Sequence, residues 1–186
     1  MNARKLTAAM LALALTASPA AMAANSADQR LAQVTLAVKN TLSIDDGYTD
    51  FYGEPNETPL GTKWNLEWYD SEGDRSLNVT ATDQGKVLNY NRSATRDETF
   101  TDGYGPHFPA MTQDQAKAKA EEFLARVLTT GESAVFDERW NSGVGLNVSQ
   151  YGFSGGIYLN GIPTPMTFRI WVWVSDGGVT NFWRGD

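Results

Sequence analysis

The sequence has no cysteine and a single histidine, His107, among its 186 residues. Without cysteine the chain forms no disulfide bond, no thiolate zinc site and no cysteine nucleophile. With one histidine it cannot build a metal site that needs two histidine ligands, such as the H-E-x-x-H site of metalloproteases. These two absences exclude several large classes of enzyme and metalloprotein.

Positive charge is also scarce, because 15 lysine and arginine residues stand against 22 acidic residues, for a net charge of -7. An acidic chain is a poor binder of phosphate backbones, so we expect no nucleic-acid partner. The sequence contains neither a phosphate-binding loop nor a dinucleotide fingerprint. We therefore expect no cofactor.

The N-terminal segment has the three parts of a secretory signal peptide. Arg4 and Lys5 precede an uncharged apolar stretch over 6–17, and the small residues of 21–23 fit a signal-peptidase site. The apolar stretch is too short to span a bilayer core of about 30 Å. We predict that 1–23 is a signal peptide, that no integral membrane segment remains after cleavage, and that the protein is secreted, either extracellular or in the cell envelope.

Two segments carry the same helix signature. Ser26-x-x-Gln29 and Thr112-x-x-Gln115 are capping-box patterns. Apolar residues follow each at helical spacing, namely Leu31, Val34, Val38 and Leu42 in the first and Ala116, Ala120, Phe123, Val127 and Leu128 in the second. The repeated pattern predicts an internal repeat.

Alternating apolar residues after each helix predict strands separated by turns. The expected strands are 48–53, 62–69, 77–81 and 86–90 in the first part, and 134–140, 143–151, 153–159, 166–174 and 179–183 in the second. The predicted fold is α+β, with two units that each pack one helix on an antiparallel β-meander. The expected domains are unit 1 over 24–92, a linker over 93–110 and unit 2 over 111–186.

Several segments carry a resemblance to a known family, namely 41–44 with 48–51, the aromatic run 64–68, the hairpin 80–90, and in the second unit 160–163 with 174–183. Together these segments resemble PepSY-like domains, and more closely the YcdB/YcdC-type repeat. The resemblance implies that both predicted units are PepSY-like and that the protein is an extracellular or envelope module. PepSY-like domains occur in protease propeptides and are linked to peptidase inhibition, so the implied partner is a protein or peptide, with a peptidase as one option.

Few residues qualify as catalytic or metal-binding groups. His107 could act as a general base, but we expect a loop histidine. Asp70-x-Glu72-x-Asp74 lacks the glycine position of a calcium loop and fits a hairpin turn better. Weak cation sites at Asp45, Asp46 and Asp50, or at Asp97, Glu98 and Asp102, remain an alternative. We predict no catalytic residue, no metal site and no enzymatic activity.

Aromatic residues are the most distinctive feature of the sequence. Trp171 and Trp173 lie in a strand with apolar residues on both faces, so we expect that strand to be central and covered on both sides. Core packing is the preferred interpretation for these rings and for Trp64 and Trp68, with an exposed platform for sugar or peptide as the alternative. The aromatics best placed to contact a ligand lie at strand ends or in loops, namely Tyr69, Tyr104, Trp140 and Tyr151.

The leading hypothesis is a secreted non-catalytic PepSY-like module that binds a protein or peptide and modulates a peptidase. Edge-strand addition is the expected mode of binding. One alternative is a cell-wall or carbohydrate-binding module that uses exposed aromatics. A second alternative is a hydrolase that uses His107 or a pair of carboxylates.

Overall fold

The structure is a computed structural model that describes residues 27–70, 75–93, 109–137 and 148–185. The predicted signal peptide and His107 lie outside the described residues, as do the acidic cluster 97–102 and the aromatics Tyr104 and Trp140. Among the described residues, no helix has the length and apolar character needed to cross a membrane.

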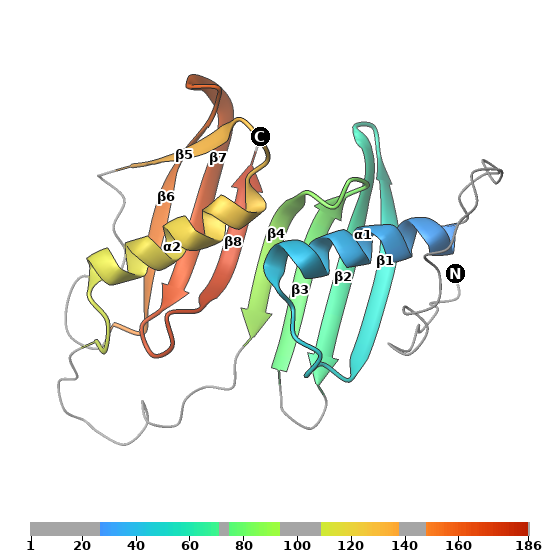
Figure 1. Cartoon of the computed structure of the whole chain (residues 1–186), viewed down its shortest axis with the longest axis horizontal. Coiled ribbons are helices and arrows are strands. Elements are labelled where there is room, and N and C mark those ends of the chain that lie inside the picture. Colours follow the sequence, from blue (N-terminus) through green and yellow to red (C-terminus); the bar gives the residue numbers. More distant parts are fainter. Residues whose placement is uncertain (1–26, 71–74, 94–108, 138–147, 186) are drawn as a thin grey trace. The chain divides into compact units, whose positions relative to one another are not determined.

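Two helices and eight strands make up the described part of the chain (Figure 1). In chain order they are α1 (Ala27–Leu42), β1 (Asp50–Thr58), β2 (Gly61–Asp70), β3 (Arg75–Thr82), β4 (Val87–Ser93), α2 (Gln113–Val127), β5 (Glu132–Phe136), β6 (Gln150–Leu159), β7 (Ile162–Trp173) and β8 (Val179–Gly185). Contacts divide the chain into two compact units, of which the first ends at Val87 and the second begins at Leu88.

The predicted fold class, two PepSY-like units that each pack one helix on an antiparallel β-meander, is wrong. The eight strands belong to one sheet in the order β1-β2-β3-β4-β8-β7-β6-β5. Strand β4 pairs antiparallel with β8, with Asn89 opposite Trp183 and Asn91 opposite Asn181. Alternation along a strand shows which of its faces is buried, but not which strand pairs with its second edge. The sequence pattern therefore missed this pairing.

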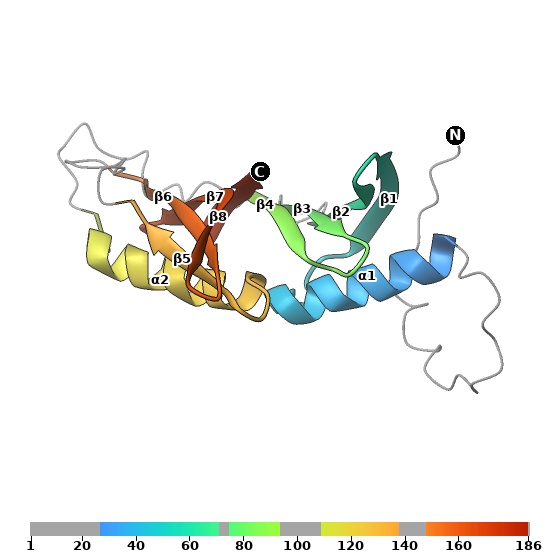
Figure 2. The same ribbon diagram turned by 90° about the horizontal axis from the view of Figure 1, so that it is seen from above.

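In the first unit, α1 packs on β1, β2 and β3 (Figure 2). The apolar face of α1 is buried, and so are Trp64, Leu66 and Trp68 on one face of β2. The indole N–H of Trp64 donates to the carboxylate of Asp83 at 2.6 Å, so this buried ring keeps a polar partner. The core position predicted for Trp64 and Trp68 is confirmed.

In the second unit, α2 packs on β6, β7 and β8 (Figure 2). Phe123 of α2 lies 5.1 Å from Tyr90 of β4 and 5.5 Å from Phe182 of β8, measured between ring centroids. These contacts identify the helix-covered face of the sheet. The prediction that β7 is central is confirmed, because it lies between β6 and β8. The expectation that this strand is covered on both sides, with Trp171 and Trp173 in the core, is not confirmed, because both rings are half-buried and occupy the face that α2 does not cover.

Local signals in the second unit predicted its helix start and one of its turns. The capping box of α2 is confirmed: Gln115 N–H donates to the Thr112 hydroxyl at 3.3 Å, and Thr112 N–H donates to the Gln115 side chain at 2.8 Å. Asn160 and Gly161, between β6 and β7, both have positive φ, as a type I′ turn requires.

Candidate functional site

The C-terminal end of α2 leads directly into the edge strand β5. The helix ends at Val127, where Leu128 N–H still donates to the Leu124 carbonyl at 2.9 Å. Gly131 then adopts a positive φ of 84°, which a residue with a side chain would adopt only with strain. The turn is short, so β5 runs back along the helix from which it came.

Glu132, the first residue of β5, holds the turn from two directions. Its carboxylate accepts a hydrogen bond from Thr129 N–H at 3.0 Å. The same carboxylate forms a two-pronged ion pair with Arg184 of β8, in which one N–H···O distance is 2.9 Å. The side chains of Arg184 and Glu132 are only 3% and 5% exposed. This buried pair fixes the start of β5 with respect to β8.

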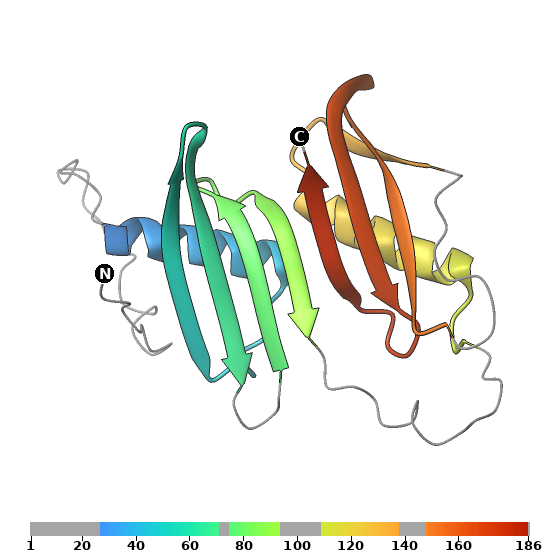
Figure 3. The same cartoon turned by 180° about the vertical axis from the view of Figure 1, so that it is seen from behind.

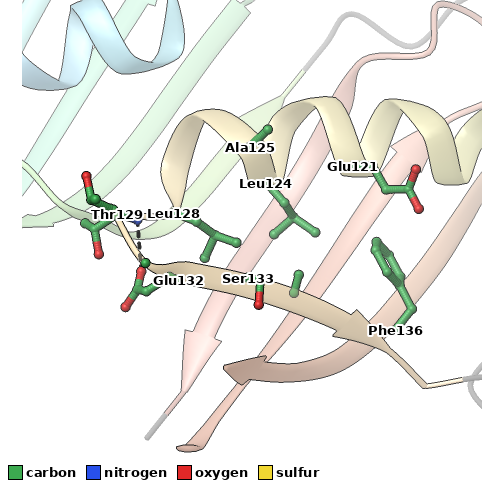
Figure 4. A pocket seen from close by; sticks show the side chains of 11 residues that line it. Glu121, Leu124, Ala125, Leu128, Thr129, Glu132, Ser133 and Phe136 are labelled. Carbon is green, nitrogen blue, oxygen red and sulfur yellow. Dashed lines mark hydrogen bonds between the residues drawn. The ribbon is translucent and has the colours of Figure 1, made fainter. Parts of the chain in front are cut away.

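A groove of about 590 Å³ separates α2 from β5 (Figure 4). Leu124 of the helix and Leu128 directly after its end line one wall, and Ala134 and Phe136 of the strand line the other. Glu121 lies at the Phe136 end of the groove. The groove thus combines apolar side chains with the Glu121 carboxylate at one end, and its lining also includes the polar residues Thr129, Thr130, Glu132 and Ser133.

The Phe136 end of the groove also carries a cation. The ammonium group of Lys117 lies 5.1 Å from the centroid of the Phe136 ring. The same group lies 3.7 Å from the Glu121 carboxylate, one turn further along the helix. A lysine over an aromatic face is attracted by the ring, so Lys117 and Glu121 together place two opposite charges at the Phe136 end of the groove.

Among the strands that the structure describes, none lies on the far edge of β5, because β5 is the last strand in the sheet order. Gly131 O accepts from Asn160 N–H at 2.7 Å, and Asp137 N–H donates to Ser154 O at 2.8 Å. In an antiparallel ladder such bonds recur at every second residue. The backbone groups of Ala134 and Phe136 therefore point away from β6, toward the open edge.

The side chains of β5 alternate in the same way. Ala134 and Phe136 are half-buried, whereas Ser133 and Val135 are exposed. An extended segment placed beside β5 would meet the backbone groups of Ala134 and Phe136. It would also lie next to the groove. The site can bind an extended chain, and its described residues show no arrangement of nucleophile, base and oxyanion donors.

The four predicted ligand-contact aromatics are not brought together by the described residues. Tyr69 is half-buried near the end of β2, and Tyr151 lies on β6 at 7% exposure. Tyr104 and Trp140 lie outside the described residues. A ligand-contact role for these residues stays a prediction.

The acidic cluster at the exit of α1 is engaged in local bonds. Asp45 accepts from Gly47 N–H at 2.7 Å, and Asp46 pairs with Lys39 at 3.0 Å. Asp50 accepts from the Thr49 hydroxyl at 3.0 Å. In the described part of the chain, no three acidic or histidine side chains gather as metal ligands would.

Sequence reasoning did not single out the residues of the groove. Leu128 was expected on the apolar face of the helix, and Ala134 and Phe136 fell within a predicted strand. The signal that could have located them is the glycine turn at Gly131 directly after α2, since it brings the strand back beside the helix. That β5 is an edge strand depends on the strand order, which no local pattern gives.

No protein-family model matches the chain, and no curated protein matches it. Among solved structures, the chain is similar to the Bacillus megaterium YpeB C-terminal domain, with a TM-score of 0.55 and 14% sequence identity. The match covers 81% of this chain and 60% of that structure, so the chain spans less than two thirds of its length. This similarity concerns the fold alone and gives partial support to the PepSY-like fold expected from the sequence.

Proposed function

We propose that the protein is a secreted, non-catalytic PepSY-like module of the bacterial cell envelope or exterior that binds an extended segment of a protein partner along the edge of β5. The open backbone groups of Ala134 and Phe136 carry this proposal. They offer main-chain hydrogen bonds to an added strand, which is the basis of β-strand addition.

The groove between α2 and β5 supports the same mode of binding. In strand addition the main chain supplies affinity and side-chain pockets supply specificity. Leu124, Leu128 and Phe136 offer an apolar pocket beside the edge for alternate side chains of the added segment. The partner segment should therefore carry apolar residues at every second position.

The edge of β5 carries neither of two residues that commonly block strand pairing. Natural edge strands often carry lysine or proline for this purpose. The five residues of β5 are Glu-Ser-Ala-Val-Phe, and its one charged side chain is buried at the start of the strand in the pair with Arg184. The edge beside Ala134 and Phe136 is therefore open to an added strand.

The charge of the protein favours a basic partner. With a net charge of -7, the chain attracts cationic proteins at long range and raises their association rate. The resemblance to PepSY-like domains adds a peptidase as the class of partner to test first.

The proposal is tested by affinity capture from the secreted fraction of the source organism, with two variants compared with the wild-type protein. Ala134→Pro removes a backbone N–H at the open edge and leaves the hydrogen bonds between β5 and β6 intact. An edge strand tolerates proline at a position whose N–H points away from the sheet. Val135→Thr is the matched control, because it alters the neighbouring exposed side chain and keeps every backbone N–H. We expect wild type and Val135→Thr to retain a common protein that Ala134→Pro loses. Recovery of no protein above background, or equal recovery by Ala134→Pro, would contradict the proposal.

A further inference from the structure

The face of the second unit's sheet that α2 does not cover has an unusual composition. No described element covers the strands β4, β8, β7 and β6 on this side (Figure 3). Since Tyr90 and Phe182 face the helix, the residues that alternate with them face outward. The strand register gives three rows of outward positions across β4, β8, β7 and β6. The first row is Asn91, Asn181, Trp171 and Gly152, and the second row is Asn89, Trp183, Arg169 and Ser154. The third row lies on β8, β7 and β6 only and consists of Gly185, Thr167 and Gly156.

This outward grid holds two tryptophans, one arginine, amides, hydroxyls and glycines, and no aliphatic side chain. The centre of a protein–protein interface is more apolar than its rim, whereas here amides lie directly beside the tryptophans, with Asn89 opposite Trp183 and Asn181 opposite Trp171. A basic peptide would need carboxylates, yet β4, β6, β7 and β8 contain no Asp or Glu although the chain has 22 acidic residues. The composition of the grid suits a ligand that is rich in hydroxyl groups and uncharged.

Trp183 provides a flat aromatic surface on this grid. A Cβ atom built on Gly185 would lie within 2.6 Å of three carbons of the Trp183 ring, so the tip of the indole occupies the space beside the Gly185 backbone. The guanidinium of Arg169 lies 5.9 Å from the Trp183 ring centroid. The residue is 42% exposed, which leaves ring surface open to solvent.

Amide side chains border this ring. Asn89 lies directly opposite Trp183 on β4, and Asn91 Nδ2 donates to Asn181 Oδ1 at 2.8 Å. Each amide has both donors and acceptors, and the bond between Asn91 and Asn181 uses only part of them. A pyranose ring presents C–H groups that pack on an aromatic face and hydroxyls that bond with amides, which is the combination that Trp183 and these asparagines offer.

The surface continues from the tryptophans into a hollow of about 460 Å³. Its lining includes Ser154, Gly156, Thr167 and Arg169 of the outward grid, and Asp137 just beyond β5. Arg169 and Asp137 have opposite charges, so the lined region is neutral within a strongly acidic protein. The hollow thus extends the flat surface without favouring a charged ligand.

We infer that this outward face of β4, β8, β7 and β6 binds an uncharged polysaccharide, with a sugar ring stacked on Trp183 and hydroxyls bonded to Asn89 and Asn91. The site is on the sheet face, whereas the proposed peptide site is on the edge of β5. A module that carries both would hold its protein partner next to a polysaccharide matrix.

The experiment is isothermal titration of the whole protein with three uncharged hexasaccharides, cellohexaose, chitohexaose and maltohexaose. We expect at least one to bind with a dissociation constant below about 10 mM, and Trp183→Ala to weaken that binding about tenfold or more, as loss of a central aromatic contact does. Asn89→Ala should weaken binding by a smaller factor. Tyr52→Ala, which removes a half-buried ring from β1, is the matched control and should bind as wild type does.

Circular dichroism spectra and thermal midpoints show which variants are folded. If Trp183→Ala does not fold, the affinity of Asn89→Ala is used for the comparison with wild type. Absence of binding by all three hexasaccharides would overturn the inference. Unchanged binding by folded Trp183→Ala and Asn89→Ala would also overturn it. Ala134→Pro should bind the sugar normally, so failure of this site and failure of the peptide site are distinguishable.

Discussion

Arg184 of β8 and Glu132 of β5 form a buried two-pronged ion pair, although two strands, β7 and β6, lie between theirs in the sheet order. Arg184 also contacts the sulfur of Met166 on β7 at 3.2 Å. The pair spans the helix-covered side of the sheet. It links the inner strand β8 to the start of the edge strand that carries the proposed binding site.

Removal of one partner of this pair should destabilise the protein strongly. We expect Arg184→Leu to lower the free energy of unfolding by about 3–5 kcal/mol, because the Glu132 carboxylate is left buried without its partner. The double variant Glu132→Leu with Arg184→Leu should be more stable than Arg184→Leu alone. Urea unfolding of the three proteins measures both effects, and a double variant no more stable than the single one would contradict the role assigned to the pair.

Loss of the acceptor for the buried Trp64 indole should also be costly. Asp83→Ala leaves the Trp64 N–H without its 2.6 Å partner, and we expect a loss of about 1–3 kcal/mol. Asp83→Asn keeps an oxygen acceptor in place and is the matched control. Thermal or urea unfolding gives the comparison. Equal stability of the two variants would show that the hydrogen bond contributes nothing.

The capping box of α2 should contribute a measurable part of the stability. Thr112→Ala removes the hydroxyl that accepts from Gln115 N–H, and we expect a loss of about 1 kcal/mol. Thr112→Ser retains a capping hydroxyl and should lose much less. Urea unfolding of both variants checks the prediction, which fails if serine and alanine have the same effect.

Tyr52 should titrate above its ordinary value of 10.0. Its hydroxyl donates to the Glu54 carboxylate at 2.7 Å, and this bond is the main reason why its pKa is raised; desolvation and the charges of Glu54 and Glu67 act in the same direction. Because the bond favours the neutral phenol, its stabilising contribution is present below pH 10 and is lost as the pH rises through the raised pKa. Nuclear magnetic resonance of the labelled Tyr52 ring measures the titration.

Glu54→Gln should return the pKa of Tyr52 toward its ordinary value, since it removes the charge and weakens the bond. Glu67→Gln should have a smaller effect, because Glu67 acts only through its charge. The interpretation fails if Glu54→Gln leaves the titration of Tyr52 unchanged.

Local structure was largely predictable from the sequence, and strand order was not. The capping box at Thr112 and the buried face of Trp64, Leu66 and Trp68 follow from patterns within a few residues, and both were predicted correctly. The pairing of Asn89 with Trp183 joins residues more than ninety positions apart. This pairing depends on which strand edges are left unpaired once the helices have packed on the sheet. The hydrophobic periodicity of the sequence does not contain that information.

The candidate site was missed for the same reason. The aromatics chosen from the sequence were selected because they stood at strand ends or in loops, but Tyr151 is packed within β6. Trp183, the exposed ring of the sheet face, was counted only as part of the last strand. The Trp183 ring is exposed because it lies on the face of β8 that α2 does not cover. The meander expected from the sequence did not specify on which face of the strand this ring lies.

The most direct test of the account is residue-resolved amide hydrogen exchange of the protein alone and in complex with the partner recovered by capture. In the free protein, the amides of Ala134 and Phe136 should exchange faster than those of Ser133 and Val135, which point toward β6. In the complex, the amides of Ala134 and Phe136 should become protected. A bound partner that leaves the exchange of these two amides unchanged would contradict binding along the edge of β5.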